Sequence, residues 1–107
     1  MSITVHLYYK GKDGSAMKFV KEMESSGTAD AIRKEDGNLR YDYYVPVNDP
    51  ETVLLIDSWK DQHSIDVHHS SPMMATIAAL REKYDLHMEV ECFFSDDEQV
   101  DESFIRK

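Results

Sequence analysis

Three of the five histidines lie close together in the second half of the chain, with an aspartate between them. His63, Asp66, His68 and His69 are all residue types that bind metals. On a helix, positions 63 and 68 differ by about 140° around the axis, so their side chains cannot meet on one ion. His68 and His69 differ by about 100°, so at most one of them points inward. This segment therefore predicts no metal site and a single inward histidine.

That inward histidine has two interpretations. It can act as a base, a hydrogen-bond donor or a lone haem ligand. Alternatively, a backbone carbonyl near the end of its helix holds it, and it takes no part in chemistry. The residues leave both open.

Trp59 is the only tryptophan, and we expect it at the end of a strand beside the histidines. Its indole can anchor a core or form the flat apolar wall that an aromatic ligand needs. Tyr41, His6 and Met73 are either core residues or the lining of a pocket between helices and sheet. Cys92 is expected to be a small buried side chain and not a nucleophile, because no helix N-terminus or base is predicted beside it.

The first half of the chain predicts a strand, a broken helix and a second strand. β-Branched and aromatic residues over 3–9 favour a strand that ends at the glycine-containing turn after it. Apolar residues at helical spacing predict one helix over about 14–35, capped by Asp13 and interrupted near residues 25–28. Alternating polarity over 39–45 then predicts a half-buried strand.

The second half repeats this plan. Residues 52–59 are apolar on both parities, which is typical of a strand buried on both faces. A short helix is expected to begin at Asp61 or Ser64 and to end near the paired histidines. Ser71-Pro72 marks the start of another helix, with the serine as N-cap and the proline at the first helical position. Residues 86–94 alternate again and predict the last strand.

The order βαββαβ predicts an α+β, ferredoxin-like fold, in which both helical regions pack on one face of a four-stranded antiparallel sheet. The other face is then bare. We expect apolar side chains of the first and last strands to lie there, either Ile3, Val5 and Leu7 or Met88, Val90 and Phe94. A second copy packed sheet on sheet would cover such a patch, so the pattern predicts a homodimer. The alternative is that the C-terminal tail folds back over this face.

Length and composition fit one small domain over residues 1–94 with an acidic tail over 95–107. The 107 residues carry a net charge of −9, which disfavours nucleic acid and anionic membranes as partners. A single cysteine allows no intrachain disulfide. No apolar run approaches the roughly 20 residues of a membrane-spanning helix, and no signal segment is evident, so we expect a cytoplasmic protein.

Three stretches in order resemble the antibiotic biosynthesis monooxygenase (ABM) family. They are Gly37-Asn-Leu-Arg-Tyr41 before a hairpin, Asp57-Ser-Trp59 at a strand end, and His68-His-Ser-Ser-Pro-Met73 at a helix break. The resemblance covers about residues 3–94. It implies a dimeric α+β barrel with a pocket between sheet and helices in each subunit.

The resemblance also implies a function. Many members are cofactor-independent monooxygenases, so we expect this chain to oxidise a small aromatic or quinol-type substrate with dioxygen and without flavin, metal or haem. In that interpretation Trp59 flanks the substrate ring and His68 accepts or steadies the phenolic proton. The remaining expected substrate-binding residues are His6, Tyr41, Asp57, His69 and Met73. For Asp57, a structural hydrogen bond is an alternative role.

Two other functions stay open. Haem-degrading members of the family carry an asparagine on the first strand, where this chain has Thr4 and His6. A haem-binding protein is nevertheless possible if His68 or His69 faces the pocket. The family often has a histidine after the proline of the helix break, and this chain has Met73 there. That departure is compatible with a non-catalytic dimer that binds a small ligand.

Overall fold

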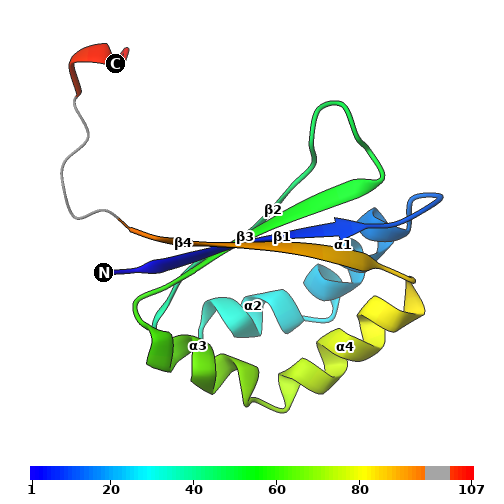
Figure 1. Ribbon diagram of the computed structural model, residues 1–107. Coiled ribbons are helices and arrows are strands. Elements are labelled where there is room, and N and C mark those ends of the chain that lie inside the picture. The colour runs from blue at the N-terminus through cyan, green and yellow to red at the C-terminus, as the bar shows by residue number, and fades with distance from the viewer. Residues whose placement is uncertain (96–101) are drawn as a thin grey trace.

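The computed structural model describes residues 1–95 and 102–107, and its topology matches the expected α+β ferredoxin-like fold. In chain order the elements are β1 (Ile3–Lys10), α1 (Ser15–Ser25), α2 (Thr28–Arg33), β2 (Asn38–Tyr44), β3 (Thr52–Trp59), α3 (Gln62–His69), α4 (Met73–Lys83), β4 (His87–Phe94) and a short 3-10 helix, η1 (Glu102–Phe104). The strands form one antiparallel sheet in the order β2-β3-β1-β4. All four α-helices lie on the same side of the sheet (Figure 1).

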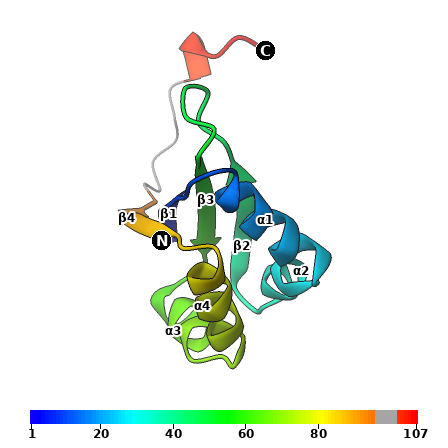
Figure 2. The same ribbon diagram turned by 90° about the vertical axis from the view of Figure 1, so that its right-hand side faces the viewer.

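The helices form two pairs on this face, α1 with α2 and α3 with α4 (Figure 2). Phe19 and Met23 of α1 and Ile32 of α2 are fully buried against the sheet, where Tyr9 and Leu55 meet them. This core fixes one half of the sheet. Within residues 1–95 and 102–107, no helix is both long and apolar enough to cross a membrane.

The helix starts differ in part from those expected. Asp13 is not an N-cap: its own φ is +54°, and Gly14 at φ +79° is the N-cap of α1, without a side-chain hydrogen bond. The Asp-Gly pair forms a left-handed turn, a conformation that glycine adopts at little cost. Asp61 does cap α3, because its carboxylate accepts a hydrogen bond from the Ser64 N–H at 2.8 Å. Pro72, and not Ser71, is the N-cap of α4.

The strand register places the apolar side chains of β1 on the helix side of the sheet. Ile3 and Tyr9 are buried there, and Val5 and Leu7 share their parity. Their partners on β4 are Phe94, Cys92, Val90 and Met88, in that register. The prediction that these apolar side chains lie on the open face of the sheet is therefore wrong. β3 is apolar on both parities, so its pattern did not reveal which face the helices cover.

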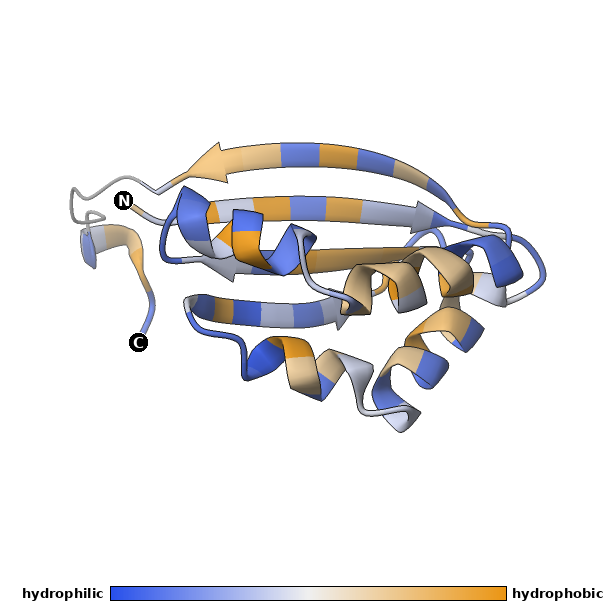
Figure 3. Ribbon diagram, turned by 90° about the horizontal axis from the view of Figure 1, so that it is seen from below, coloured by the Kyte–Doolittle hydropathy of each residue, from blue (hydrophilic) through white to orange (hydrophobic). Residues whose placement is uncertain are grey.

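Edge strand β4 is exposed along its whole length. In the view from the helix side, no helix lies in front of it (Figure 3). Cys92 is consequently exposed, which corrects the expectation of a buried thiol. Every residue of 102–107 is also exposed, so that part of the tail does not cover the sheet. The rest of the acidic tail, over residues 96–101, lies outside the described residues, and the domain boundary stays a prediction.

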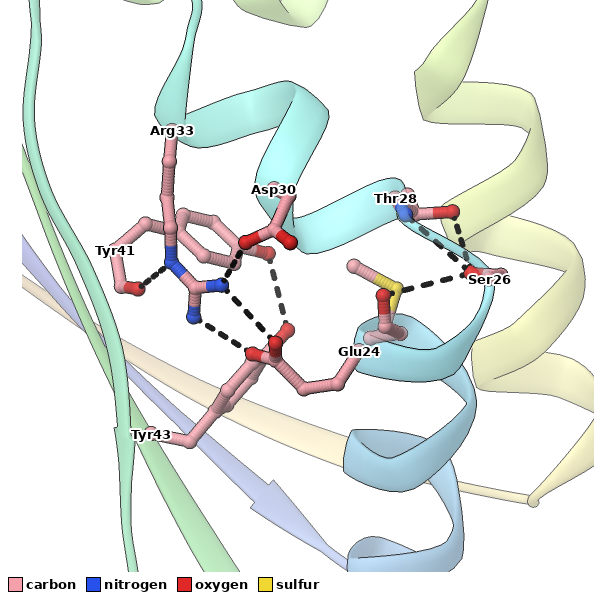
Figure 4. Close-up of polar contacts among 8 residues, drawn as sticks. Glu24, Ser26, Thr28, Asp30, Arg33, Tyr41 and Tyr43 are labelled. Atoms are coloured by element: carbon pink, nitrogen blue, oxygen red, sulfur yellow. Dashed lines mark hydrogen bonds and ion pairs between the residues drawn. The ribbon is translucent and has the colours of Figure 1, made fainter.

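Arg33 joins three elements on the opposite edge of the sheet (Figure 4). Its Nε donates to the backbone oxygen of Tyr41 in β2 at 2.9 Å. Its two terminal nitrogens donate to Glu24 of α1 at 2.6 and 3.0 Å, and one of them also donates to Asp30 of α2 at 2.8 Å. The two carboxylates raise the pKa of the guanidinium, so Arg33 stays charged.

We expect Arg33→Ala to lower the free energy of unfolding by about 1–2 kcal/mol, because it removes charge-assisted hydrogen bonds that join α1, α2 and β2. The matched control is Arg40→Ala, which removes only exposed contacts, to Asp42 at 3.3 Å and to the hydroxyl of Tyr44, and should cost less than about 1 kcal/mol. Urea unfolding of both variants measures the difference. Equal urea midpoints for the two variants would show that the contacts of Arg33 stabilise the fold no more than those of Arg40.

Candidate active site

A pocket of about 340 Å³ lies on the helix side of the sheet, between the strands β1 and β4 and the helices α3 and α4. Its volume falls within the range of small-molecule sites. The sheet wall of the pocket consists of side chains from β1 and β4, namely Ile3, Val5, Leu7, Met88, Val90 and Cys92. The pocket is thus built on the half of the sheet that α1 and α2 do not cover.

The rest of the lining comes from β3, α3 and α4 and, besides Ile65 and Met74, consists of polar and aromatic side chains. Asp57 and Trp59 come from the end of β3, Gln62 and His69 from α3, and Arg81 from α4. Asp57 and Trp59 share a parity, so both point toward the helices. The pocket therefore places one carboxylate, one guanidinium and one indole next to an aliphatic surface.

Asp57 is 6% exposed, and its Oδ1 has no hydrogen-bond partner among the described residues. Burial raises the pKa of this carboxyl to about 6, while a hydrogen bond from Trp59 and the charge of Arg81 act in the opposite direction. A buried polar atom without a partner costs free energy unless water or a ligand satisfies it. Asp57 therefore offers a hydrogen-bond acceptor to whatever fills the pocket.

Arg81 provides a matching donor. One of its terminal nitrogens donates to the Tyr9 hydroxyl at 3.0 Å, and the guanidinium lies over the Tyr9 ring at 5.4 Å. Its Nε is buried without a partner among the described residues. Arg81 and Asp57 lie near enough for the cation to lower the pKa of the carboxyl, but no ion pair joins them in the described structure. A ligand hydroxyl or oxyanion between them would satisfy both.

His68 lies behind the indole and does not line the pocket. It is 5% exposed and stacks on Trp59, with the ring centroids 4.8 Å apart and the planes 28° from parallel. Its Nδ1 lies 2.7 Å from Oε2 of Glu35, so a carboxylate, and not a backbone carbonyl, is its partner. Burial lowers the pKa of His68, and the charge of Glu35 partly offsets that effect. The neutral imidazole donates from Nδ1 and leaves Nε2 as an acceptor.

We expect Glu35→Gln to lower the pKa of His68 further, because the carboxylate is the main group that favours the imidazolium. Histidine NMR titration measures this pKa directly. Asp66→Asn is the matched control, because the Asp66 carboxylate accepts a hydrogen bond from Gln62 and none from His68. A His68 pKa that is the same in wild type and Glu35→Gln would contradict the pairing.

The two neighbouring histidines divide as the helix geometry predicted, with one buried. His69 is exposed and lines the pocket, and its ring lies 5.6 Å from that of His68. His63 lies apart, in a separate pocket of about 250 Å³ beside Glu35 and Asp36. Over residues 1–95 and 102–107, no group of three or more His, Cys, Asp or Glu side chains is arranged to hold a metal ion.

Three expected substrate-binding residues do not line this pocket. His6 lies on the open face of the sheet, because its parity is opposite to that of Val5; its Nδ1 is 3.9 Å from Oε1 of Glu91. Tyr41 is buried on β2, where its hydroxyl accepts a hydrogen bond from Tyr43 at 3.3 Å. Met73 packs against the core, and its neighbour Met74 faces the pocket instead.

Sequence reasoning missed Arg81 and Glu35. Arg81 follows the buried Ile77 by four residues, so a basic residue on the apolar face of the predicted helix was the available signal. No comparable signal exists for Glu35, because it is 33 residues from His68 along the chain and meets it only in the folded structure.

Comparison with known proteins identifies relatives. The model of the family described as antibiotic biosynthesis monooxygenase matches residues 2–80. The Bacillus subtilis (strain 168) protein "Putative monooxygenase YcnE" is 28% identical over 69 residues, which are 64% of this chain and 70% of that protein.

Two solved structures share the fold. A "putative antibiotic biosynthesis monooxygenase" from Deinococcus radiodurans has a TM-score of 0.79 at 17% identity. The match covers 94% of this chain and 97% of the Deinococcus chain. SnoaB, a cofactor-independent oxygenase from Streptomyces nogalater, has a TM-score of 0.74 at 12% identity. The match covers 91% of this chain and 95% of the SnoaB chain. At such identities the likeness shows the fold alone.

Proposed function

Because this chain belongs to the antibiotic biosynthesis monooxygenase family, we propose that it oxidises a small phenolic or quinol-type substrate with dioxygen, without flavin, metal or haem. The observation that carries the proposal is the unpartnered oxygen of the buried carboxyl of Asp57, a residue that lines an otherwise largely apolar pocket. The absence of a cofactor is part of the proposal; SnoaB, which shares the fold, is a cofactor-independent oxygenase.

The first step is removal of the phenolic proton. A base works best when its pKa lies near the working pH, and burial raises the pKa of Asp57 to about 6. The substrate hydroxyl donates to Oδ1 of Asp57 and transfers its proton there. Arg81 then stabilises the phenolate, because its unpartnered Nε can donate to the developing oxyanion.

Trp59 and His68 position the substrate ring. Trp59 lines the pocket and provides a flat apolar surface for the ring. His68 is placed behind it by the stacking contact and the bond to Glu35. In this proposal His68 therefore acts through Trp59, and Asp57 takes the role of proton acceptor that the sequence suggested for His68.

The electrons come from the substrate itself. The phenolate reduces dioxygen, and one oxygen atom forms a bond to a ring carbon while the oxygen–oxygen bond breaks. For a quinol, the other oxygen atom leaves as water, whose two hydrogens come in net from the two hydroxyl groups. The product is a hydroxylated quinone, and no external reductant is needed. The protein excludes competing water by the aliphatic wall of the pocket.

Oxygen consumption with a panel of hydroquinones, measured with a metal chelator present, tests this function. We expect uptake well above the rate without protein for at least one member of the panel, and one labelled oxygen atom in the product when the gas is ¹⁸O₂. Binding of quinols without oxygen uptake would instead indicate the non-catalytic function. A Soret band that sharpens on addition of haemin would favour the haem-binding function and count against this proposal.

We further propose that two copies pair through their open sheet faces in the cytoplasm. Leu54 and Ile56 of β3 point to this face, and the exposed Tyr44 and Phe93 flank them. Sedimentation velocity should give a species of twice 12.4 kDa for the wild type. Ile56→Lys should give single chains, because it would bury a further charge within the contact, between His6 and Asp42. A wild-type protein that sediments as single chains would contradict the pairing.

A further inference from the structure

Resting on the proposed function, we propose that the natural substrate is a lipophilic phenol, in which the oxidised ring carries an aliphatic chain. The chain would lie along the surface that β1 and β4 form on the helix side of the sheet. We call this surface the aliphatic strip; it comprises Val5, Leu7, Met88 and Val90.

The strip is continuous because the strands are in register. Leu7 of β1 is paired with Val90 of β4, and the pairs on either side are Val5 with Cys92 and Tyr9 with Met88. Residues of one parity share one face, so these side chains form a run of cross-strand neighbours. The run begins in the pocket and follows the strands.

The polar groups of the pocket lie toward its β3 side, away from the edge strand β4. Asp57, Gln62, His69 and Arg81 come from β3, α3 and α4, and none comes from β1 or β4. A hydroxylated ring that bonds to Asp57 and Arg81 therefore has its polar partners at the β3 side of the pocket. Toward β4, the lining side chains offer no hydrogen-bond donor or acceptor stronger than the thiol of Cys92 to the remainder of the substrate. An unsubstituted ring would leave much of this surface in contact with water.

The strip also reaches solvent at the edge of the sheet. Val90 is 58% exposed and Met88 43% exposed, and no helix lies in front of β4 in the view from the helix side (Figure 3). Apolar surface that is exposed next to a pocket is a common sign of a binding site. A chain on the ring would extend from the pocket along β4 and remove both side chains from water.

Binding under argon tests the inference without requiring turnover. The probes are hydroquinones that carry a methyl, propyl or pentyl group, and the reporter is the fluorescence of Trp59, the only tryptophan, which lines the pocket. Burial of one methylene is worth about a fourfold change in affinity when complete. We expect the Kd to fall about threefold for each methylene added.

Val90→Asp should abolish this dependence on chain length, so that the propyl and pentyl compounds lose their gain in affinity over the methyl compound. The matched control is Val47→Asp, at a valine that is 99% exposed in the turn between β2 and β3. Both sites are exposed, so both variants should fold.

Affinities that do not depend on chain length in the wild type would overturn the inference. The inference would also be overturned if Kd depended on chain length equally in Val90→Asp and Val47→Asp. A Val90→Asp protein that keeps this dependence but sediments differently from the wild type would show that the strip is a contact between copies. Failure of the proposed function has a different signature, namely normal binding without oxygen uptake.

Discussion

Asp57→Asn should inactivate the protein and stabilise it at the same time. If Asp57 accepts the phenolic proton, kcat/KM should fall about 10²–10⁴-fold, the range that a general base contributes. In the wild type, kcat/KM should rise as the pH increases through about 6, because the ionised carboxyl is the active form. That rise should be absent from the residual activity of the variant.

The effect on stability has the opposite sign. Burial raises the pKa of Asp57 from 3.8 to about 6, so the folded state holds this proton more tightly than the unfolded state does. The favourable contribution is complete below pH 3.8 and is lost as the pH rises through about 6. At about 1.4 kcal/mol per pKa unit, ionised Asp57 costs the folded protein about 3 kcal/mol at pH 8. Asparagine avoids that cost.

Urea unfolding of wild type and Asp57→Asn at a series of pH values measures this difference. The variant should be the more stable by about 3 kcal/mol at pH 8, and the gap should shrink toward zero below pH 4. Asp42→Asn is the matched control, because Asp42 is exposed on β2. If the wild type were as stable as Asp57→Asn at pH 8, the claim that the buried, ionised Asp57 carboxyl destabilises the folded protein would be wrong.

Arg81→Gln should lower kcat/KM by about 100-fold, because it removes the cation that stabilises the phenolate. It should also move the rise in activity to higher pH. The charge of Arg81 lowers the pKa of Asp57, so its removal leaves burial less opposed. A purely structural role, through the bond to Tyr9, would reduce stability without moving the pH profile.

The pH profiles of kcat/KM for wild type, Arg81→Gln and Arg81→Lys decide between these roles. Lysine keeps the charge, so Arg81→Lys should recover part of the activity and a profile close to that of the wild type. An Arg81→Gln enzyme whose activity rises at the wild-type pH would show that Arg81 does not act on Asp57. Thermal unfolding of the three proteins reports the structural contribution separately.

Local patterns predicted most of the fold. Residues 52–59 are apolar on both parities, and they form the strand β3 next to the centre of the sheet. Asp61 begins a helix because its carboxylate bonds to a backbone N–H only three residues away. Each of these features depends on neighbours in the sequence, which is why the sequence alone reveals them.

Features that depend on distant contacts were harder to predict. Alternation along β4 predicts a buried Cys92 but does not reveal that no helix covers this edge strand (Figure 3), which leaves the thiol exposed. The family resemblance points to Asp57, but its unpartnered oxygen becomes evident only when β3 and α4 are placed together. The partnership of Glu35 with His68 likewise requires the folded chain.

The most direct test of the account is the protonation state of Asp57 and of a bound quinol when oxygen is absent. Infrared difference spectroscopy under argon at pH 7 should show a protonated carboxyl that appears on binding and is missing in Asp57→Asn, while the ultraviolet spectrum shows the phenolate. A quinol that binds beside Trp59 as the neutral phenol, with Asp57 still ionised, would contradict the proposed chemistry.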